Sequence, residues 1–344
     1  MTAGGHSGPL SDDNRSGTWS GRDMKPSSPP PLDLADVGPL IARLRTGERR
    51  TLSAVVTEFE RASAHMPPIM EALAVDLGRA LVVGFTGPPG AGKSTLVNAY
   101  VAALRHARLT VGIVAVDPSS PVSGGAILGD RLRMTSSLAD DGVFMRSLAS
   151  GGHLGGLCPA AVRIIDALDG AGKDVIVLET VGTGQSEIDV AEVADVRVVL
   201  AAPGLGDDIQ AMKSGLLEIA DVLVVNKADR PGAEATRLQL RSALHLRSAS
   251  PIPAVLSTCA VDATGVADLV LEIARLGALS HTQPPLERRR RRARFLIARA
   301  AADLVAERMR RDPAHQLMAL TDAVLAGRQT PVDAARALLS SADV

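Results

Sequence analysis

The chain has 344 residues, of which 46% are hydrophobic and only 2% aromatic, so it can bury a sizeable core built from Leu, Val, Ile and Ala. A net charge of −1 argues against broad nucleic-acid binding, because such binding favours a strongly basic face. No apolar run reaches the roughly 18 residues of a membrane span, and two distant cysteines, Cys158 and Cys259, suggest neither a disulfide framework nor a zinc site. We therefore expect a cytoplasmic protein without membrane or nucleic-acid partners.

The first 78 residues are predicted to form a tail followed by a helical segment. Residues 1–33 are dominated by Gly, Ser, Pro and charge, and they bury too little apolar surface to offset the entropy of ordering, so we expect a disordered tail. Over 34–78, apolar residues recur at spacings of three and four, which predicts a helical segment. These residues are Leu40, Ile41, Leu44, Leu52, Val55, Val56 and Phe59.

Between residues 79 and 278, short runs rich in Val and Ile alternate with helical stretches. Continuous apolar strands that alternate with helices predict an α/β domain with a mainly parallel sheet covered on both faces. The five runs are 80–87, 110–117, 174–179, 196–202 and 221–229.

Residues 279–344 return to helix and form the expected C-terminal arm. A capping pattern at Thr330, with Pro331 at the first helical position, predicts a final helix. An earlier helix is marked by one apolar stripe, which consists of Leu296, Ile297, Ala300, Ala301, Leu304, Val305 and Met309.

The first apolar run leads into a glycine-rich phosphate-binding motif. Residues 87–94 read Gly-Pro-Pro-Gly-Ala-Gly-Lys-Ser, with a strand before and a helix after, as this motif requires. The glycines let backbone amides approach phosphate oxygens, and the helix N-terminus adds partial positive charge. We predict that Lys93 reaches the β/γ-phosphates and is catalytic, and that Ser94 ligates Mg²⁺. The predicted nucleotide-binding residues here are Gly87, Gly90, Ala91, Gly92, Lys93, Ser94 and Thr95.

The base is predicted to be guanine. Asn226-Lys227-Ala228-Asp229 closes an apolar strand and resembles the guanine-specificity motif of GTPases. The Asp229 carboxylate can accept hydrogen bonds from guanine N1–H and N2–H₂, and adenine offers neither donor there. A site built around such bonds rejects the wrong base strongly, because a buried partner is left unpaired. The sequence therefore predicts GTP as the substrate.

Carboxylates stand at the ends of two predicted strands. Glu179 ends one of them, at the position where phosphate-loop proteins hold Mg²⁺ with an acid. Asp117 ends another, at the ligand edge of the sheet, and a long loop rich in Pro, Ser and Gly leads from it to Asp130. Because Mg²⁺ prefers hard oxygen ligands, we expect Asp117, Asp130, Glu179 and Ser94 to surround it, and we expect the loop to respond to the γ-phosphate.

Together these motifs resemble the MeaB/ArgK family, GTPases that serve adenosylcobalamin-dependent acyl-CoA mutases. The resemblance covers about 38–340 and rests on "GFTGPPGAGKST", "AVDPSSPVSGGAILGDRLRM", "SGGHLGG", "ETVGTGQSE", "PGLGDDIQAMKSGLLEIAD" and "NKAD". It implies a P-loop GTPase with N-terminal helices and a C-terminal helical arm that joins two copies in a homodimer. It also implies that GTP hydrolysis gates cofactor loading and protects or reactivates the mutase, with an adenosyltransferase as a further partner.

The same resemblance maps the metal-site acids of the family onto Asp117, Asp130 and Glu179. It assigns the segment "PGLGDDIQAMK" to coupling with the mutase, with Lys213 as its basic, catalytic residue. One departure is the last guanine-contacting motif, normally Ser-Ala, which reads Cys259-Ala260 here, although backbone amides there can still serve the base.

A second departure lies in the loop after Asp117, where residues 123–126 read Ser-Gly-Gly-Ala and the family has Thr-Gly-Gly-Ser. No arginine is an obvious catalytic finger, and the candidates are Arg131, Arg133 and Arg146. The run Glu287–Arg294 holds six arginines; in an otherwise balanced chain we expect it to be the solvated helical start of the arm rather than a nucleic-acid site.

Two other functions stay open. A small-molecule kinase would need an acceptor pocket and an aligned catalytic base, and the sequence offers no such constellation. A nickel-insertion GTPase would need Cys or His ligands, whereas the histidines are scattered and Cys158 has no close Cys partner. The motifs do not select among methylmalonyl-CoA, isobutyryl-CoA and hydroxyisobutyryl-CoA mutases, which all have related partners.

Overall fold

The computed structural model describes residues 32–117, 140–149, 157–180, 186–204, 215–246, 252–311 and 315–340. The predicted tail falls almost wholly outside these ranges, as do Asp130, Lys213, Arg131 and Arg133. Within the described ranges, no helix combines the length and the apolarity that a membrane-spanning segment requires.

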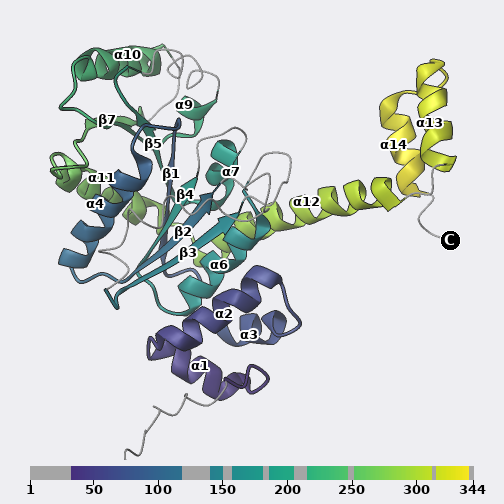
Figure 1. The fold of residues 1–344 in the computed structure, drawn as a ribbon, viewed down its shortest axis with the longest axis horizontal. Coiled ribbons are helices and arrows are strands. Elements are labelled where there is room, and N and C mark those ends of the chain that lie inside the picture. The colour runs from purple at the N-terminus through teal and green to yellow at the C-terminus, as the bar shows by residue number, and fades with distance from the viewer. Residues whose placement is uncertain are drawn as a thin grey trace, which may run out of the picture.

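The centre of the fold is a seven-stranded sheet in which every strand runs parallel to its neighbours (Figure 1). The strand order is β3-β2-β4-β1-β5-β6-β7. The strands are β1 (Leu81–Thr86), β2 (Val111–Asp117), β3 (Val143–Ala149), β4 (Val175–Thr180), β5 (Val196–Ala201), β6 (Val222–Val225) and β7 (Ala254–Ser257). The predicted α/β class with a parallel sheet is therefore confirmed.

The five predicted runs are the five central strands, and the two strands that the sequence did not reveal are the edges. Central strands are buried on both faces, so they read as continuous apolar runs. In edge strand β3 the apolar residues are interrupted by Arg146 and Ser147. Edge strand β7 has only four residues, and none of them is fully buried. Partial burial thus removes the signal by which the other strands were predicted.

Alternate strand residues face two layers of helices. From β1, Val83 and Phe85 pack with α4 (Lys93–His106) and α11 (Val266–Ser280). Val82 faces the opposite layer, where the predicted N-terminal stripe is buried as expected. The helices of that opposite layer are α1 (Val37–Arg45), α2 (Arg49–Arg61), α3 (Met66–Leu73), α6 (Pro159–Gly170), α7 (Ser186–Val193), α9 (Leu216–Ile219) and α10 (Ala233–His245).

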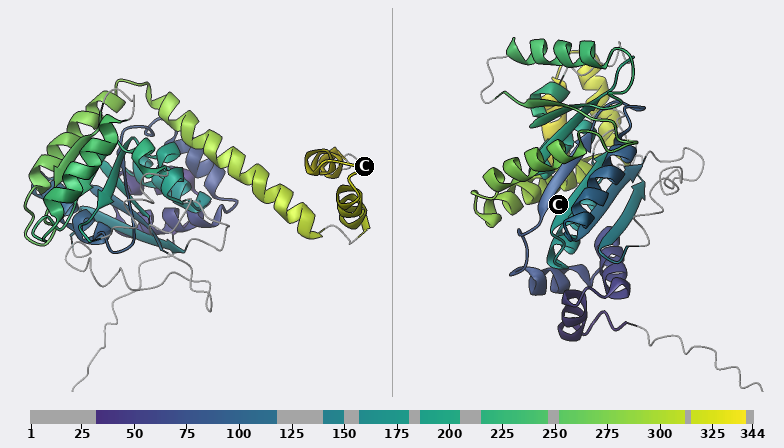
Figure 2. Two further views of the ribbon diagram at one scale, coloured as in Figure 1. Left: turned by 90° about the horizontal axis from the view of Figure 1, so that it is seen from above. Right: turned by 90° about the vertical axis from the view of Figure 1, so that its left-hand side faces the viewer.

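The C-terminal arm begins with the long helix α12 (Pro285–Arg311). At about 1.5 Å per residue this helix is about 40 Å long, and it carries α13 (His315–Leu325) and α14 (Pro331–Ser340) away from the sheet (Figures 1 and 2). The cap predicted for α14 is present, because the amide of Asp333 donates to the Thr330 hydroxyl at 3.1 Å.

The expectation that the arginine run is solvated is wrong at the N-terminal end of α12, residues 285–295, which we call its root. Arg288 and Arg292 are only 3% and 2% exposed, because this part of α12 lies against α6 and α7. Their guanidinium groups face the carboxylates of Asp195 and Asp169 at 3.3 and 3.9 Å. The run is therefore largely an anchor for the arm.

Candidate functional site

The loop between β1 and α4 has the backbone that its glycines permit. Gly87, Gly90 and Gly92 have φ values of 138°, 79° and 89°, a region that L side chains rarely adopt. A Cβ at Gly92 would lie 2.5 Å from Nδ2 of Asn226, so a larger residue there would displace the base motif. The loop and the motif at 226 are thus packed directly together.

Lys93 lies in the first turn of α4 and is folded back over the loop. Its Nζ donates to the carbonyl oxygens of Gly87 at 2.8 Å and Pro88 at 3.0 Å, and the residue is 7% exposed. The loop therefore holds one buried positive charge beside the backbone amides of its glycine-rich turn.

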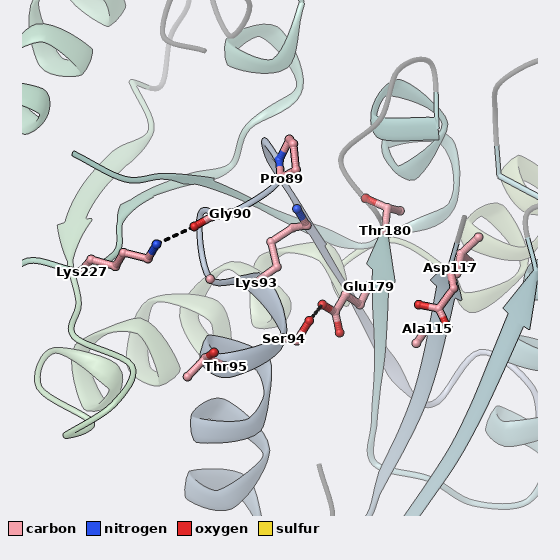
Figure 3. Close-up of a pocket in the computed structure, with 12 residues that line it drawn as sticks. Pro89, Gly90, Lys93, Ser94, Thr95, Ala115, Asp117, Glu179, Thr180 and Lys227 are labelled. Atoms are coloured by element: carbon pink, nitrogen blue, oxygen red, sulfur yellow. Dashed lines mark hydrogen bonds between the residues drawn. The ribbon is translucent and has the colours of Figure 1, made fainter. Parts of the chain in front are cut away.

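A cavity of about 400 Å³ opens beside this loop at the carboxyl ends of the strands. Figure 3 shows Lys93 and Ser94 on one side of it and Asp117 and Glu179 on the neighbouring strand ends. The carboxyl ends of parallel strands are where open α/β sheets bind ligands. The sequence-predicted residues that line the cavity are Gly90, Gly92, Lys93, Ser94, Thr95, Asp117, Glu179 and Lys227.

Three oxygen-bearing side chains converge on one face of the sheet. The Ser94 hydroxyl donates to Oε1 of Glu179 at 2.5 Å. Ala115 pairs with Glu179 in the register of β2 and β4, so Asp117, two residues further, points to the same face as Glu179. Asp117 and Glu179 are both 5% exposed. Two buried carboxylates and a hydroxyl are a donor set that fits Mg²⁺, which takes oxygen ligands.

The base motif follows β6 and is joined to the phosphate loop. Asn226 is 2% exposed; its amide donates to the carbonyl of Ala91 at 2.9 Å, and its Oδ1 accepts from the Thr258 hydroxyl at 3.1 Å. Lys227, with φ 57°, donates from Nζ to the carbonyl of Gly90 at 2.6 Å. The structure thus brings these two distant motifs into direct contact.

Asp229 is exposed in the turn after β6, and Cys259 is buried beside it. A hydrogen bond with the backbone amide of Asp262 lowers the pKa of the Cys259 thiol. Burial and the nearby carboxylates of Asp262 and Asp229 have the opposite and larger combined effect, so the pKa of this thiol is raised. Ala260 follows, and its amide donates to Oδ1 of Asn226 at 3.3 Å. These residues form a cluster next to the cavity, although they do not line it.

Two threonines at the site, Thr86 and Thr180, were not predicted from the sequence. Thr180 lines the cavity, and its hydroxyl lies 3.2 Å from that of Thr86 across β4 and β1. Both residues are buried. Threonine is a common strand residue, so only its position directly beside Glu179 and Gly87 could have indicated a place in the site.

Arg146, a candidate catalytic arginine, lies on β3 and faces helix α2. Its Nε donates to Oε2 of Glu60 at 2.7 Å, and it does not line the cavity. The structure therefore does not bring this arginine to the predicted nucleotide site.

Comparison with known proteins decides the family. The family model described as "Methylmalonyl Co-A mutase-associated GTPase MeaB" matches residues 50–314. The chain belongs to the MeaB family. This MeaB-family protein is a GTPase with the P-loop GTPase fold that its sequence predicts.

Individual relatives agree with this assignment. A protein of Pyrococcus abyssi is 48% identical over 209 residues, which are 61% of this chain and 64% of that protein, less than two thirds of its length. "GTPase ArgK" of Escherichia coli is 41% identical over 222 residues, which are 62% of this chain and 67% of that protein. A crystal structure described as "LAO/AO transport system kinase" superposes with a TM-score of 0.71 at 27% identity, covering 92% of this chain and all of that one.

Proposed function

We propose that this MeaB-family GTPase gates the loading of adenosylcobalamin into an acyl-CoA mutase and protects or reactivates that mutase. The single observation that carries the nucleotide part is the convergence of the phosphate loop, two buried carboxylates and the base motif at one edge of the sheet. The family description, which names methylmalonyl-CoA mutase, supports the partner. An adenosyltransferase, which would deliver the cofactor, is the further proposed partner.

Within this proposal Lys93 exchanges its two carbonyl partners for phosphate oxygens when GTP binds. Ser94, Asp117 and Glu179, with Asp130 from outside the described residues, would hold Mg²⁺, which supplies charge neutralisation at the β- and γ-phosphates. Asp229 would accept hydrogen bonds from the guanine edge. In the structure the Cys259 amide donates to the carbonyl of Thr264 at 2.9 Å and the Ala260 amide donates to Oδ1 of Asn226, so of these two amides only that of Ala260, whose bond is the longer at 3.3 Å, is proposed to turn to the base.

The proposed homodimer uses the outer part of α12. Ile297 and Leu304 are 69% and 67% exposed, and their spacing of seven residues places them on one face of a helix that leaves the body of the protein. Exposed apolar faces of this kind mark interfaces, and we propose that a second copy of the arm covers it. Leu304→Glu should convert dimer to monomer in analytical ultracentrifugation, whereas Leu271→Glu, on the exposed face of α11, should not. Equal sedimentation of both variants and the parent would overturn this interface.

Product analysis separates the GTPase chaperone from a small-molecule kinase. The protein is incubated with GTP, Mg²⁺ and a small-molecule extract, and phosphorus-containing products are resolved. We expect GDP and inorganic phosphate only, and a phosphorylated acceptor would instead establish a kinase. Capture from native lysate in the presence of a non-hydrolysable GTP analogue should then recover a cobalamin-dependent mutase subunit. Absence of any such subunit, with both the analogue and GDP, would contradict the chaperone role.

A further inference from the structure

The arginines at the root of α12 meet one carboxylate inside the protein. Nη1 of Arg288 lies 3.3 Å from Oδ2 of Asp195, and Nη2 of Arg291 lies 3.4 Å from Oδ1 of the same residue. Arg291 also donates to the carbonyl of Ala194 at 2.8 Å. The Asp195 side chain is fully buried, so the arm is attached to the GTPase domain through a buried charge cluster.

Asp195 follows helix α7 in the chain and is hydrogen-bonded to β1, the strand that leads to the phosphate loop. It lies between the last residue of α7 and the first residue of β5. Its carboxylate accepts from the amide of Val82 at 3.0 Å, and its own amide donates to the carbonyl of Val82 at 2.7 Å. One residue therefore holds α7, β1 and α12 together.

Helix α7 connects this cluster with the nucleotide end of the sheet. It begins at Ser186, six residues after Thr180 of the cavity wall, and ends at the cluster. Its Val190 is packed so closely on β1 that a Cβ at Gly84 would lie 2.2 Å from Cγ1 of Val190. Three residues beyond Gly84, the chain enters the phosphate loop at Gly87. If α7 shifts, it must therefore either push against β1 or displace α12, because closely packed elements deform little.

The charge cluster is incompletely satisfied. Among the described residues, the buried Nε atoms of Arg288 and Arg291 have no hydrogen-bond partner. The ion-pair distances to Asp195 also exceed the roughly 2.7–2.9 Å of strong charge-assisted hydrogen bonds. Buried ion pairs contribute little net stability, so we infer that the main effect of this contact is on the orientation of α12 at the point where it is attached.

We propose that Arg288 and Arg291 are positioning residues for GTP hydrolysis, which act through Asp195 and α7 so that the direction of the arm and the occupancy of the nucleotide cavity are coupled. Coupling of this kind is reciprocal: a nucleotide that shifts α7 changes the root of α12, and a change at the root alters the nucleotide site. The proposal rests on GTP binding and hydrolysis and is independent of the mutase.

The test compares three full-length variants with the parent. Arg291→Gln removes one charge at a residue that is 31% exposed, and Arg291→Lys restores the charge. Arg290→Gln is the control, since the ion pair of Arg290 within the described residues is with Glu287 on the surface of the same helix. Hydrogen exchange is followed for peptides covering 285–295 without nucleotide, with GDP and with a non-hydrolysable GTP analogue. Protection of 87–95 in the same samples establishes that nucleotide is bound.

In the parent and in Arg290→Gln we expect exchange of 285–295 to differ between the GDP and analogue states. In Arg291→Gln that difference should vanish, the affinity for the GTP analogue relative to GDP should change about 3- to 10-fold, the range of modest coupling energies, and kcat should fall. Arg291→Lys should recover much of each property. The proposal is overturned if 285–295 exchanges identically in all parental states, or if Arg291→Gln keeps both the nucleotide response and the parental kcat. Failure of the analogue to protect 87–95 would overturn GTP binding itself.

Discussion

The hydroxyl of Ser94 donates a hydrogen bond of 2.5 Å to the carboxylate of Glu179, which joins the first turn of α4 to the end of β4. Asp117 stands on the neighbouring strand β2 and points to the same face of the sheet. Oxygen-bearing side chains from three separate segments therefore lie at one end of the sheet. This donor set suits the proposed Mg²⁺, which takes oxygen ligands and would assist phosphoryl transfer.

Removal of one carboxylate charge should affect hydrolysis more than nucleotide binding. We expect Asp117→Asn to lower kcat for GTP by at least about tenfold, because a proposed Mg²⁺ ligand is weakened, while the phosphate loop still binds GDP without Mg²⁺. Phosphate release and a fluorescent GDP analogue measure the two properties. Asp268→Asn, on an exposed position of α11, is the matched control. If Asp117→Asn hydrolyses GTP as fast as the control, Asp117 is an ordinary strand-end acid.

Base selection should depend on Asp229. In Asp229→Asn the amide can no longer accept both guanine N–H groups, and loss of a charged hydrogen bond costs about 1.5–3 kcal/mol, so GTP affinity should fall by about 10- to 150-fold. Xanthosine triphosphate should bind the variant better than the parent, because its C2 carbonyl can accept from the new amide. Titration of both nucleotides into both proteins measures this exchange. Comparable affinity of the parent for ATP and GTP would refute the assignment.

The contact between α7 and β1 should tolerate no added methyl group. We expect Gly84→Ala to lower the free energy of unfolding by about 1–3 kcal/mol, because its Cβ would lie 2.2 Å from Val190 and 3.1 Å from Ala194. The comparison is Gly38→Ala on α1, where no atom lies within 4 Å of the added Cβ. Urea denaturation of the two variants measures the difference. Equal stabilities would show that α7 can move off the strand at little cost.

Stability should depend on pH through Asp166, which lies beneath α12 with Oδ1 3.6 Å from Nε of Arg292. Burial raises the pKa of Asp166 to about 6, against the lowering effect of Arg292. Because the pKa of this carboxyl group is higher in the folded state than its value of 3.8 in the unfolded state, its contribution to stability is fully present below pH 3.8. This contribution is lost as the pH rises through 6. Asp166→Asn is neutral throughout, so its stability relative to the parent should rise by about 2–3 kcal/mol from pH 4 to pH 8. A pH-independent difference in denaturation free energy would contradict this origin.

The sequence predicts the parts of this fold that repeat a simple physical pattern. The central strands, the stripe on α1 and α2 and the cap at Thr330 were all predictable, because burial on two faces, helical spacing and capping chemistry each leave a local signal. The edge strands leave a weaker signal because they are only half buried. Local patterns also fail where charge is buried by a distant partner: nothing near Arg288 in the sequence indicates that Asp195 faces it.

In the candidate site, too, contiguous motifs are predictable from the sequence and contacts between distant segments are not. The loop at 87–94 and the motif at 226–229 are contiguous, so their residue types and spacing predict them. Their contact, through Asn226 and Lys227 to the carbonyls of Ala91 and Gly90, depends on the order of strands in the sheet and is visible only in three dimensions.

The central claim is that hydrolysis by this GTPase serves an acyl-CoA mutase, and the rate of phosphate release with and without that mutase tests it most directly. Alone, the protein should turn over slowly: no arginine is evident as a catalytic finger from the sequence and none of the described residues that line the cavity is an arginine, and such a finger is worth roughly 10³–10⁵ in rate. We predict that an adenosylcobalamin-dependent methylmalonyl-CoA, isobutyryl-CoA or hydroxyisobutyryl-CoA mutase accelerates phosphate release by the parent. Lys213→Ala should lose most of this acceleration and keep its affinity for GTP. An unchanged rate with all three mutases would contradict the account, and equal acceleration of parent and variant would remove Lys213 from it.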